Sequence, residues 1–411
     1  MNEQVSAPVG LLVVGASLAG LRAVESARRH GFEGAIILVG AEEHLPYDRP
    51  PLSKDFLKAD GGTPDFFVSE RELEDHLNID VRLGVRATGL DTANRTVRLS
   101  DDSTVTFERL IIATGTAPRL IPNLPVDPRI HVLRTLDDAA RLRSSLQGAR
   151  RVVTIGAGFI GSEIASSAAE LGSDVWIVEA ADVPLVRAVG IEIGKALSEL
   201  HPRHGTTLLC GQPLTGVEAT PDAVVLTLGT GEQLLADAVV VGIGSAPATA
   251  WLEESGLNLH ERDRGVICDE FLETSVPGIF AAGDVVHWPN SVMGDVMRLE
   301  NWTNAADQGD RAARNAVSVN ERLPFETVPY FWSDWYGHRI QFVGTGDADE
   351  VVFVSGSAGE DKFVALLRRG DRLIGAATLN EPRKIMKIRR LIALRCSWEQ
   401  ALDELRLPVR A

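Results

Sequence analysis

Short apolar runs alternate with amphipathic segments along most of the chain, a pattern typical of an α/β protein with parallel sheets. The clearest unit begins at Val152–Ile155, an apolar run rich in β-branched residues, as expected of a buried strand. A helical pattern follows as far as Gly172, and a second apolar run covers Val175–Val178. This order predicts a strand, a turn, a helix and a parallel strand.

The same order of segments occurs at the start of the chain. Leu11–Val14 and Ala35–Val39 are apolar runs, and a helical pattern lies between them, from Leu18 to about His30. Further strands are expected at Val81–Val85, Thr96–Leu99, Phe107–Ala113 and Leu234–Ile243, and further helices from about Ser53, over Ile191–His204 and over Ala305–Val317.

The last part of the chain has a different pattern. Pro324 and Pro329 mark a boundary. Beyond it we expect strands and then a helix, at Ile340–Val343, Val351–Val354, Phe363–Arg368, Leu373–Leu379 and from about Pro382 to Leu394. The chain is therefore predicted to be α/β, with two Rossmann-like dinucleotide-binding domains and a smaller α+β C-terminal domain. The expected boundaries are 1–115 with 246–323 for the first domain, 116–245 for the second and 324–411 for the third.

Composition and charge exclude several classes of protein. The 411 residues contain no apolar run that approaches the roughly 18 residues of a membrane span, so we expect no membrane association. A net charge of −16 argues against nucleic acid as the main partner. The segment MNEQVSAPVG lacks the basic start of a signal peptide, so a cytoplasmic protein is expected. Cys210, Cys268 and Cys396 are far apart, which excludes a local redox disulfide and an iron–sulfur cluster, and no metal is expected.

A complete dinucleotide fingerprint follows the strand at Val152–Ile155. Gly156 allows the tight turn, Gly158 lets a pyrophosphate approach the backbone, and Gly161 lets the helix pack on the strand. Glu179 ends the next strand, where its carboxylate can bind both ribose hydroxyls and repel a 2′-phosphate, which favours NADH over NADPH. Gly244 closes this domain and allows backbone approach to the nicotinamide. A purely structural glycine turn is the alternative.

A second, incomplete fingerprint lies near the N-terminus. Gly15, Ser17 and Gly20 repeat the turn, with serine in place of the second glycine. Ala41 occupies the position expected for the ribose acid, so Glu42 is the candidate substitute. Two such units in one chain predict two dinucleotides, one a tightly held flavin and the other a diffusible nicotinamide. The alternative is that one unit is a vestigial repeat.

Further segments point to the flavin. Arg49 and Lys54, in the proline-rich stretch at 44–54, place cations beside the first glycine turn, unless they are only solvated loop cations. The turn Thr114–Gly115 is where a flavoprotein chain leaves its FAD domain. Gly283–Asp284 follows another apolar strand, and the carboxylate there can bind the hydroxyls of the ribityl chain.

Nearly the whole chain carries, in order, VGASLAG, PYDRPPLSKDF, LIIATGTAPR, LRTLDDA, VVTIGAGFIGSEIA, VVVGIG, GIFAAGDV and FWSDWYGHRIQFVG. This set resembles the oxygenase-coupled, FAD-dependent NADH:ferredoxin reductases, and PPLSK with FWSD distinguishes it from the disulfide reductases. The resemblance implies a glutathione-reductase-like fold. It also implies electron transfer from NADH through FAD to a small iron–sulfur ferredoxin, which feeds a haem-thiolate monooxygenase or a Rieske dioxygenase. The alternatives are an NADH oxidase or an apoptosis-inducing-factor-like flavoprotein without a ferredoxin partner, and a redox sensor without turnover.

The motifs and the resemblance together define two expected sets of residues. The FAD set comprises Gly15, Ser17, Ala19, Gly20, Glu42, Arg49, Lys54, Ala87, Thr114, Gly115, Arg134, Gly283, Asp284, Trp302 and Trp332. The NAD set comprises Gly156, Gly158, Ile160, Gly161, Glu163, Glu179, Gly244 and Glu300. The resemblance also implies that Trp332 and Trp335 lie near the isoalloxazine, and core packing is the alternative for each. No catalytic acid or base is expected, since hydride transfer from NADH to a flavin needs none.

Basic residues are concentrated at the C-terminal end. From Lys362 onward twelve Lys and Arg stand against five Asp and Glu, within a chain whose net charge is −16. Ferredoxins of this family are typically acidic, so we expect binding through a local basic surface. The candidates are Arg383, Lys384, Lys387 and Arg390 at helical spacing, and Arg311 and Arg314 on the helix after Asp284. The alternative is a solvated basic helix without a partner.

Overall fold

The structure, a computed structural model, describes residues 8–58, 62–318 and 321–405. The start of the chain at 1–7, with most of the segment considered as a signal peptide, and the basic residues Arg406 and Arg410 lie outside this description. The chain forms two compact units. Unit 1 comprises residues 1–48, 65–117 and 246–327, and unit 2 comprises 49–64, 118–245 and 328–411.

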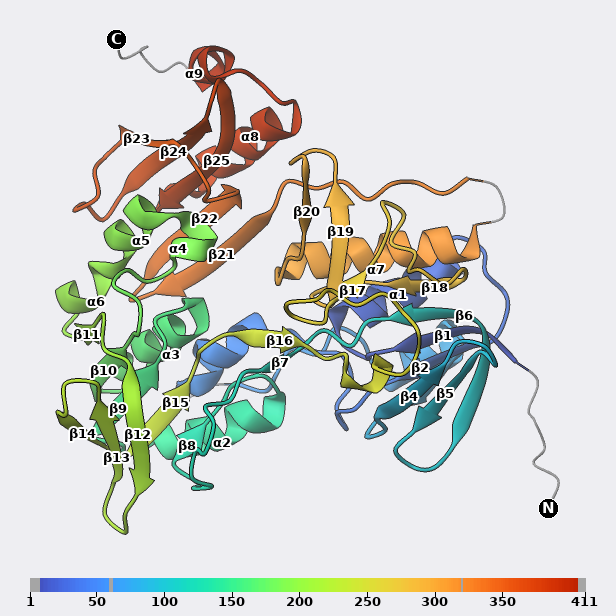
Figure 1. The fold of residues 1–411 in the computed structure, drawn as a ribbon, viewed down its shortest axis with the longest axis horizontal. Coiled ribbons are helices and arrows are strands. Elements are labelled where there is room, and N and C mark those ends of the chain that lie inside the picture. Colours follow the sequence, from blue (N-terminus) through green and yellow to red (C-terminus); the bar gives the residue numbers. More distant parts are fainter. Residues whose placement is uncertain (1–7, 59–61, 319–320, 406–411) are drawn as a thin grey trace. The chain divides into compact units, whose positions relative to one another are not determined.

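Unit 1 is built on a seven-stranded sheet (Figure 1). Its parallel strands are β1 (Val9–Val14), β2 (Ile36–Val39), β3 (Ile79–Arg82), β6 (Thr104–Ile112) and β18 (Ile279–Ala281). β4 (Ala87–Asp91) and β5 (Thr96–Leu99) extend it beyond β6 as antiparallel strands. β1 and β2 are almost wholly buried, which is why they read as continuous runs of Val, Leu and Ile.

Two helices of unit 1, α1 (Leu18–Arg29) and α7 (Trp302–Val317), lie side by side (Figure 1). Their close approach depends on Gly309, because a Cβ there would lie 2.2 Å from the carbonyl oxygen of Ala19. A small three-stranded sheet and short helical turns complete the unit: β17 (Val266–Ile267), β19 (Val286–Asn290), β20 (Asp295–Met297), η3 (Glu72–His76) and η4 (Ala250–Leu252).

Unit 2 contains a five-stranded parallel sheet in the order β11-β10-β9-β15-β8. The strands are β8 (Ile130–His131), β9 (Arg151–Ile155), β10 (Asp174–Val178), β11 (Thr207–Leu209) and β15 (Ala238–Val241). Its helices are α2 (Leu136–Leu146), α3 (Phe159–Glu170), α4 (Val186–Val189), α5 (Ile191–Ser198) and α6 (Leu200–Arg203). Smaller elements are β12 (Leu214–Ala219), β13 (Val224–Leu228), β14 (Gln233–Ala236), η1 (Pro50–Ser53) and η2 (Asp55–Leu57). The strands β7 (Thr116–Pro118) and β16 (Ser245–Pro247) pair with each other, and both lie where the residue ranges of the two units meet.

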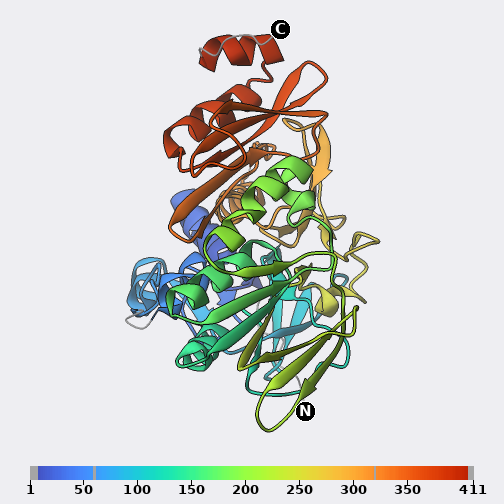
Figure 2. The ribbon, with the colours of Figure 1, turned by 90° about the vertical axis from the view of Figure 1, so that its left-hand side faces the viewer.

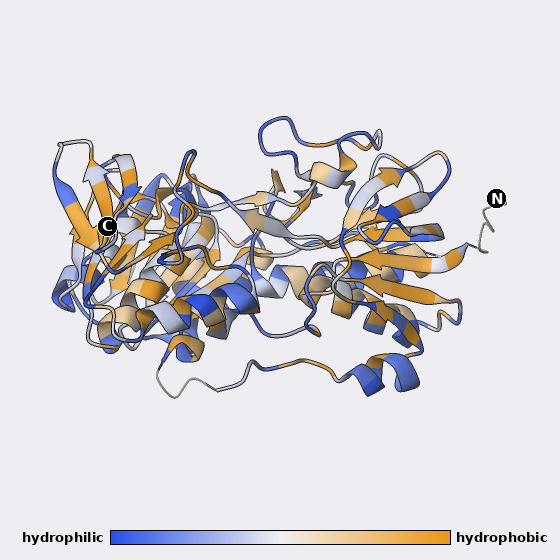
Figure 3. Cartoon of the chain, turned by 90° about the horizontal axis from the view of Figure 1, so that it is seen from below, coloured by the Kyte–Doolittle hydropathy of each residue, from blue (hydrophilic) through white to orange (hydrophobic). Residues whose placement is uncertain are grey.

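The C-terminal part of unit 2 is an antiparallel sheet in the order β21-β22-β25-β24-β23, with α8 packed on it (Figure 2). Its elements are β21 (Tyr330–Trp335), β22 (His338–Gly344), β23 (Glu350–Ser355), β24 (Phe363–Arg369), β25 (Arg372–Leu379), α8 (Pro382–Ala393) and α9 (Trp398–Leu405). The helix α8 buries Ile385, Ile388, Leu391 and Ile392 and exposes its basic residues. Many strands are apolar, whereas the helices carry apolar and polar residues, as an amphipathic surface helix does (Figure 3).

The α/β prediction, with two parallel sheets and a smaller C-terminal sheet with helices, is confirmed. Three predicted elements are wrong in detail. In place of a helix from Ser53, the chain forms two short 3₁₀ turns, η1 and η2, separated by Lys54, whose φ of −124° and ψ of −111° are not helical. The helix Ile191–His204 breaks at Glu199, where Pro202 removes the donor of the next helical bond. Leu234–Ile243 is two strands separated by Asp237, whose carboxylate accepts from the N–H groups of residues 150 and 151.

Among the helices of the described ranges, none combines the length and the apolar character needed to cross a membrane. Two segments were not anticipated. Arg49–Pro64, which carries the PPLSK motif, belongs to unit 2 rather than to the unit that precedes it in the sequence. The helix α2 lies within a stretch for which no element was predicted, although Thr135 and Asp138 form a capping box at its start.

Candidate cofactor-binding sites

The first glycine turn lies in unit 1, between β1 and α1. Gly15 has φ +118°, and a Cβ there would lie 2.1 Å from the carbonyl oxygen of Ala113. A Cβ on Gly20 would lie 1.8 Å from the carbonyl oxygen of Gly15. Both glycines are therefore required by the packing of the turn itself. Ser17 is the N-cap of α1, so the turn presents the helix N-terminus, which favours a bound phosphate.

Glu42 follows β2 and is held by a side chain of the same loop. The hydroxyl of the buried Tyr47 donates to Glu42 Oε2 at 2.6 Å. Ala41, at the position expected for the ribose acid, is exposed and has no polar side chain. The structure therefore brings a fixed carboxylate to the end of β2, one residue beyond the expected position.

The turn after β18 brings together several expected flavin residues. Gly283 has φ +82°, and its N–H donates to Gln308 Oε1 at 2.9 Å. Arg298 Nη1 donates to the carbonyl oxygen of Asp284 at 2.9 Å and pairs with Glu300 at 2.8 Å. Glu300 thus lies in unit 1, bound through Arg298 to the turn that carries Asp284.

The remaining expected flavin residues of unit 1 have well-defined surroundings. Trp302 Nε1 donates to Asp48 Oδ1 at 2.8 Å, and the Trp302 ring meets Phe67 edge to face. Ala87 is buried at the start of β4. Thr114 Oγ1 donates to the carbonyl oxygen of residue 248 at 3.0 Å, and Gly115 has φ +65°.

One buried amide in the first turn of α7 provides a test of fit for a polar cofactor. Asn304 is 3% exposed, and neither polar atom of its side chain has a hydrogen-bond partner among the described residues. An unsatisfied buried amide costs about 1–3 kcal/mol, so a partner from outside the chain is expected. A bound flavin nucleotide offers such polar groups, and Asn304 was missed because an isolated asparagine in a helix carries no sequence signal.

The second glycine turn, in unit 2, contains two glycines that the packing requires and one that leaves room for a ligand. Cβ atoms on Gly156 and Gly161 would lie 2.4 Å and 2.3 Å from carbonyl oxygens of the chain. Gly158 differs, because its φ is −73° and no atom lies nearer than 3.9 Å to the position of its Cβ. The chain itself therefore does not require glycine at 158, and the open space there fits a pyrophosphate.

Glu179 lies at the end of β10, as predicted, and is fixed by the backbone. Its Oε2 accepts from the N–H of Ala157 and its Oε1 from the N–H of Ala181, both at 2.8 Å. Gly244 has φ +98°, and the position of its Cβ is open. Ile160, in the first turn of α3, is half exposed, so an apolar surface lies directly beside the glycine turn.

A buried polar network in unit 2 joins two residues that were assigned to different cofactors. Lys54 Nζ lies 2.9 Å from Glu163 Oε1, and the two side chains are 16% and 7% exposed. Ser53 Oγ donates to Glu163 Oε2 at 2.5 Å, and Ser333 Oγ donates to Glu163 Oε1. Both serines stand within recognised motifs, PPLSK and FWSD, but the sequence alone did not reveal that they meet one carboxylate.

The two tryptophans of the FWSDW stretch have different surroundings. Trp335 is 1% exposed, packs on Phe159 and donates from Nε1 to Ser333 Oγ at 2.8 Å, so it is a core residue of unit 2. The alternative given for Trp335, core packing, is therefore confirmed, and its distance from the isoalloxazine stays a prediction. Trp332 is partly exposed, with the guanidinium of Arg339 5.5 Å from its ring centroid.

Three expected flavin cations of unit 2, Arg49, Lys54 and Arg134, lie on the segments around η1 and α2. Arg49 donates to the carbonyl oxygen of Arg134 through Nη1, so the two residues meet. Lys54 Nζ also lies 3.1 Å from the carbonyl oxygen of Pro50. The alternative interpretation of Lys54 as a solvated loop cation is excluded by its buried ion pair with Glu163.

A buried histidine beside this network was missed by the sequence analysis. His201 is 1% exposed, with Nδ1 2.8 Å from the hydroxyl of Tyr336 and Nε2 3.2 Å from Ser162 Oγ. Burial, and to a smaller degree the neighbouring His204, lower the pKa of His201 to about 4. Burial raises the pKa of Tyr336 to about 12. Both groups are therefore neutral at physiological pH and serve as hydrogen-bonding groups.

The candidate basic surfaces differ in availability. Arg383, Lys384, Lys387 and Arg390 are all exposed on α8. Lys384 lies 3.6 Å from Glu381, and Lys387 donates to the carbonyl oxygen of Glu404. Arg311, in contrast, is half buried and donates through Nη1 to the carbonyl oxygen of Pro324 at 2.6 Å, so it serves the fold of unit 1. Arg314 is half buried on the same helix.

Two family models match this chain. The model for the pyridine nucleotide-disulphide oxidoreductases matches residues 10–309, and the model for the reductase C-terminal domain matches residues 330–404. The rhodocoxin reductase of Rhodococcus erythropolis is 34% identical over 96% of this chain and 92% of its own length. The ferredoxin–NAD(+) reductase component of the p-cumate 2,3-dioxygenase system of Pseudomonas putida is 34% identical over 100% and 99%. The covalent putidaredoxin reductase–putidaredoxin complex contains a similar structure, with a TM-score of 0.88, 29% identity and coverage of 95% and 94%.

Proposed function

The chain belongs to the pyridine nucleotide-disulphide oxidoreductase family, and on that premise we propose that it is an FAD-dependent NADH:ferredoxin reductase. It takes hydride from NADH onto FAD and passes the electrons singly to a small iron–sulfur ferredoxin, which feeds a haem-thiolate monooxygenase or a Rieske dioxygenase. The observation that carries the proposal is the presence of two glycine turns on parallel sheets in one chain, at Gly15–Gly20 and at Gly156–Gly161.

Some of the residues assigned to FAD belong to unit 1 and others to unit 2. The turn from Gly15 through Ser17 to Gly20 holds the pyrophosphate, and the Tyr47-bound carboxylate of Glu42 takes the adenosine ribose. Asp284 binds the ribityl hydroxyls. The other contacts assigned to FAD are Ala19, Arg49, Lys54, Ala87, Thr114, Gly115, Arg134, Gly283, Trp302 and Trp332.

The NADH site is assigned to unit 2. The open space at Gly158 takes the pyrophosphate, and Glu179 takes the ribose hydroxyls with the oxygen lone pairs that Ala157 and Ala181 leave free. Ile160 and Gly244 are also assigned to NADH, and Gly244 allows the backbone to approach the nicotinamide. Glu163 is assigned to the nicotinamide end, and Glu300 of unit 1 is the second acid assigned to that end.

Bound FAD supplies the chemistry that accepts a hydride and releases electrons one at a time. The residues of the chain bind the two cofactors, orient them and exclude water. Lys54 places a buried cation whose charge is balanced by Glu163, and this pair favours negative charge on a group brought near Lys54. No side chain is assigned the role of an acid or a base, so pre-organised geometry is the contribution of the protein.

The thiols argue against an NADH oxidase that works through a redox cysteine. Burial raises the pKa of Cys210, and burial also raises the pKa of the fully buried Cys268. Neither thiol is therefore readily deprotonated to the reactive thiolate. Cys396 lies between α8 and α9, in the C-terminal part of unit 2. A ferredoxin reductase needs no redox thiol, so these surroundings are consistent with the proposed activity.

The docking surface for the ferredoxin is assigned to the exposed face of α8. Arg383 and Arg390 have no ion-pair partner within the described part of the chain, so their charges are available to an acidic protein. Met386, on the same helix, is 51% exposed and adds an apolar side chain beside the basic ones. Arg314 is a second candidate in unit 1, and Arg311 is a weaker one because the fold uses its guanidinium.

The decisive experiment measures NADH-driven reduction of a panel of ferredoxins. Turnover that depends on an added ferredoxin is expected, and an NADH oxidation rate that no ferredoxin accelerates contradicts the proposal. Docking through α8 predicts that reversing Lys384 and Lys387 to Glu lowers ferredoxin reduction and leaves ferricyanide reduction intact, because a small acceptor needs no docking. Higher salt should weaken the same step, since exposed charges are screened over about 8 Å at physiological ionic strength.

A matched control reverses two exposed arginines of unit 1, Arg71 and Arg86, to Glu. It changes the net charge by the same amount and should leave ferredoxin reduction unchanged. If reversal at Lys384 with Lys387, and reversal at Arg311 with Arg314, both leave the apparent affinity for every active ferredoxin unchanged, the docking surface lies elsewhere.

The flavin is tested by heat release and chromatography, with FAD expected. Recovery of FMN, or no flavin after reconstitution, contradicts the assignment. Asp284→Ala should weaken FAD retention, because the ribityl hydroxyls lose their acceptor, whereas Asp222→Ala on an exposed turn should not.

The choice of nicotinamide is tested by steady-state kinetics. A carboxylate that faces a 2′-phosphate costs a few kcal/mol, so Glu179 predicts roughly a hundredfold preference for NADH over NADPH. Glu179→Gln should narrow that preference, and Glu218→Gln, an exposed change of the same kind on β12, should not. Equal efficiency of the wild-type protein with both cofactors would show that Glu179 is misassigned.

A further inference from the structure

A hydroxyl of the C-terminal sheet reaches the carboxylate that is assigned to the nicotinamide end of NADH. Ser333 lies in the middle of β21 and is fully buried. Its Oγ donates to Oε1 of Glu163, a residue of α3. Both residues belong to unit 2, so the C-terminal sheet contributes a contact to the helix that follows the second glycine turn.

The direction of this hydrogen bond is fixed by a third residue. Trp335 Nε1 donates to Ser333 Oγ at 2.8 Å. An indole N–H can only donate and a carboxylate oxygen can only accept, so the hydroxyl proton of Ser333 is directed to Glu163. Trp335 is itself held in the core, where its ring stacks on that of His201 at a centroid distance of 5.2 Å. The hydroxyl therefore cannot turn away without leaving buried groups unpaired.

The other oxygen of the carboxylate is held from a different segment. Ser53 Oγ donates to Glu163 Oε2 at 2.5 Å, whereas the carbonyl oxygen of Pro50 lies 3.4 Å from the same hydroxyl. Ser53 is in turn fixed on α3, because its carbonyl oxygen accepts from Ser167 Oγ at 2.8 Å. The terminal torsion of a glutamate is broad when nothing holds it. Serine donors on both oxygens restrict this torsion and so set the plane of the carboxylate.

One acceptor position of this carboxylate remains for a ligand. Oε1 accepts from Ser333 and pairs with Lys54 at 2.9 Å, whereas among the described residues Oε2 accepts only from Ser53. A carboxylate has about four acceptor positions, shared equally by its oxygens. The open position is therefore on Oε2, and a group that meets it must donate a hydrogen bond. The carboxamide of nicotinamide carries N–H donors of this kind.

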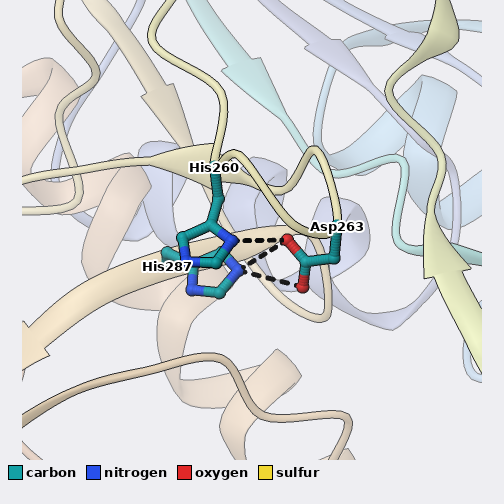
Figure 4. A group of neighbouring side chains, drawn as sticks. All are labelled: His260, Asp263 and His287. Atoms are coloured by element: carbon teal, nitrogen blue, oxygen red, sulfur yellow. Dashed lines mark hydrogen bonds and ion pairs between the residues drawn. The ribbon is translucent and has the colours of Figure 1, made fainter.

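A carboxylate of unit 1 shows the opposite situation (Figure 4). Asp263 Oδ1 accepts from a backbone N–H at 3.1 Å, and Oδ2 accepts from Arg298 Nε at 2.9 Å. His287 Nε2 lies 2.9 Å and 3.1 Å from the two oxygens, and His260 Nδ1 lies 3.1 Å from Oδ1. The chain itself surrounds both oxygens of this carboxylate, so the cluster serves the fold of unit 1. Glu163 differs in keeping a position for a ligand.

We propose that Ser333 is a positioning residue for NADH, and that together with Ser53 it directs the open acceptor position of Glu163 towards the nicotinamide carboxamide. The inference rests on the proposed function, in which Glu163 meets the nicotinamide end. Each serine acts through the carboxylate, as an outer partner that fixes a contact residue does.

Loss of either hydroxyl should misdirect the carboxylate. Without Ser333, Oε1 is held only by the ammonium of Lys54, a point charge on a flexible stem, and it gains an open position that competes for the carboxamide. Without Ser53, Oε2 has no donor among the described residues. Both changes act at the nicotinamide end and leave the glycine turn and Glu179 as they are.

The test compares two ligands that differ at the nicotinamide end, on the flavin-loaded protein. ADP-ribose carries the adenosine and the pyrophosphate without nicotinamide, and tetrahydro-NADH keeps the carboxamide but cannot give a hydride. Isothermal titration calorimetry measures the Kd of each, and the wild type should bind tetrahydro-NADH more tightly. Ser333→Ala and Ser53→Ala should each raise the Kd of tetrahydro-NADH about three- to tenfold, as loss of one hydrogen bond does, and leave the Kd of ADP-ribose unchanged.

Ser166→Ala is the matched control. Ser166 is also a buried serine of α3, and it accepts from the N–H of Tyr336, the residue after β21. In the described part of the chain it forms no hydrogen bond with Glu163. Ser333→Ala leaves the indole N–H of Trp335 unpaired and Ser166→Ala leaves the N–H of Tyr336 unpaired, so the two changes cost the fold a similar amount. The control should bind both ligands like the wild type.

The outcomes separate the positioning role from the proposed function. The positioning role is overturned if a serine variant keeps the full wild-type preference for tetrahydro-NADH, if it weakens both ligands equally, or if Ser166→Ala loses the preference as well. Should one serine variant fail to retain flavin, the other decides. A wild type without any preference shows that Glu163 is misassigned, and the inference falls with that assignment. The proposed function is judged separately, by whether NADH reduces the flavin of the wild type.

Discussion

The buried pair Lys54–Glu163 allows a quantitative test of how unit 2 is held together. Glu163 accepts from one ammonium and two serine hydroxyls while only 7% of its side chain is exposed. Glu163→Leu removes all three acceptor interactions and leaves a cation with 16% exposure and no counter-charge. Breaking a buried ion pair by removing one partner costs about 3–5 kcal/mol. Lys54→Met should cost a similar amount, because it leaves the carboxylate unpaired.

The double variant distinguishes this reasoning from simple loss of contacts. Replacing both partners with apolar residues removes the uncompensated charge, and such replacements are often near neutral. Two serine hydroxyls still lose their acceptor, so we expect a net cost of about 1–3 kcal/mol. The double-mutant cycle should therefore give an interaction energy between Lys54 and Glu163 of about 3 kcal/mol or more in favour of the pair.

The exposed pair Lys58–Glu170 in the same unit is the matched control. Its atoms lie 3.1 Å apart, but both side chains are 43% exposed, so the same cycle should give about 0.2–1 kcal/mol. Urea unfolding followed by tryptophan fluorescence, with FAD saturating and no NADH present, measures both cycles. Equal interaction energies for the two pairs, or strict additivity at Lys54 and Glu163, would refute the argument that burial gives the pair its strength.

Three other changes have expected outcomes that follow from burial and packing. The pKa of His201 is about 4 in the folded protein and about 6.5 in the unfolded chain. The free energy of unfolding should therefore be highest above pH 6.5 and fall by up to about 3 kcal/mol as the pH drops towards 4. His201→Gln should make the unfolding midpoint depend less on pH over this range. Gly158→Ala should leave thermal stability nearly unchanged and raise KM for NADH, whereas Gly161→Ala should cost several kcal/mol because its Cβ would meet a carbonyl oxygen at 2.3 Å. Trp335→Ala should destabilise unit 2 by about 3–5 kcal/mol and Trp332→Ala by much less, as measured by thermal unfolding.

The elements that could be predicted are those whose sequence pattern is local. The strands β1, β2, β9 and β10 are apolar runs because both faces of a parallel sheet are covered, and the glycines of the two turns, except Gly158, have positive φ or no room for a Cβ. The breaks at Asp237 and Glu199 could not be predicted in the same way. Asp237 ends a strand because its carboxylate accepts from the N–H groups of residues 150 and 151, far away in the sequence.

The candidate site shows the same limit more clearly. Lys54 and Glu163 were each predicted as site residues, but for different cofactors. The sequence shows that a residue is charged and does not show which residue it pairs with. The sequence left core packing and ligand contact open for Trp335, because an indole in an alternating strand gives the same pattern in both cases.

The polar face of α3 explains why three distant motifs of this chain depend on one another. Eight consecutive residues of α3, Gly161 to Ala168, are buried, and four of them are polar. Each polar side chain has a partner elsewhere in unit 2: Glu163 meets Ser53 of PPLSK and Ser333 of FWSD, and Ser167 Oγ donates to the carbonyl oxygen of Ser53. Ser162 lies 3.2 Å from His201, and Ser166 accepts from the N–H of Tyr336.

A helix that was buried by apolar contacts alone would accept many partners of similar shape. A helix buried through hydrogen bonds accepts only partners that satisfy each of them, since a single unpaired group costs about 1–3 kcal/mol. The helix that begins at the second glycine turn therefore fixes the position of η1, which Lys54 directly follows, and of β21, which contains Trp332. In this way the residues assigned to FAD in unit 2 are positioned by the same helix whose N-terminus is assigned to NADH.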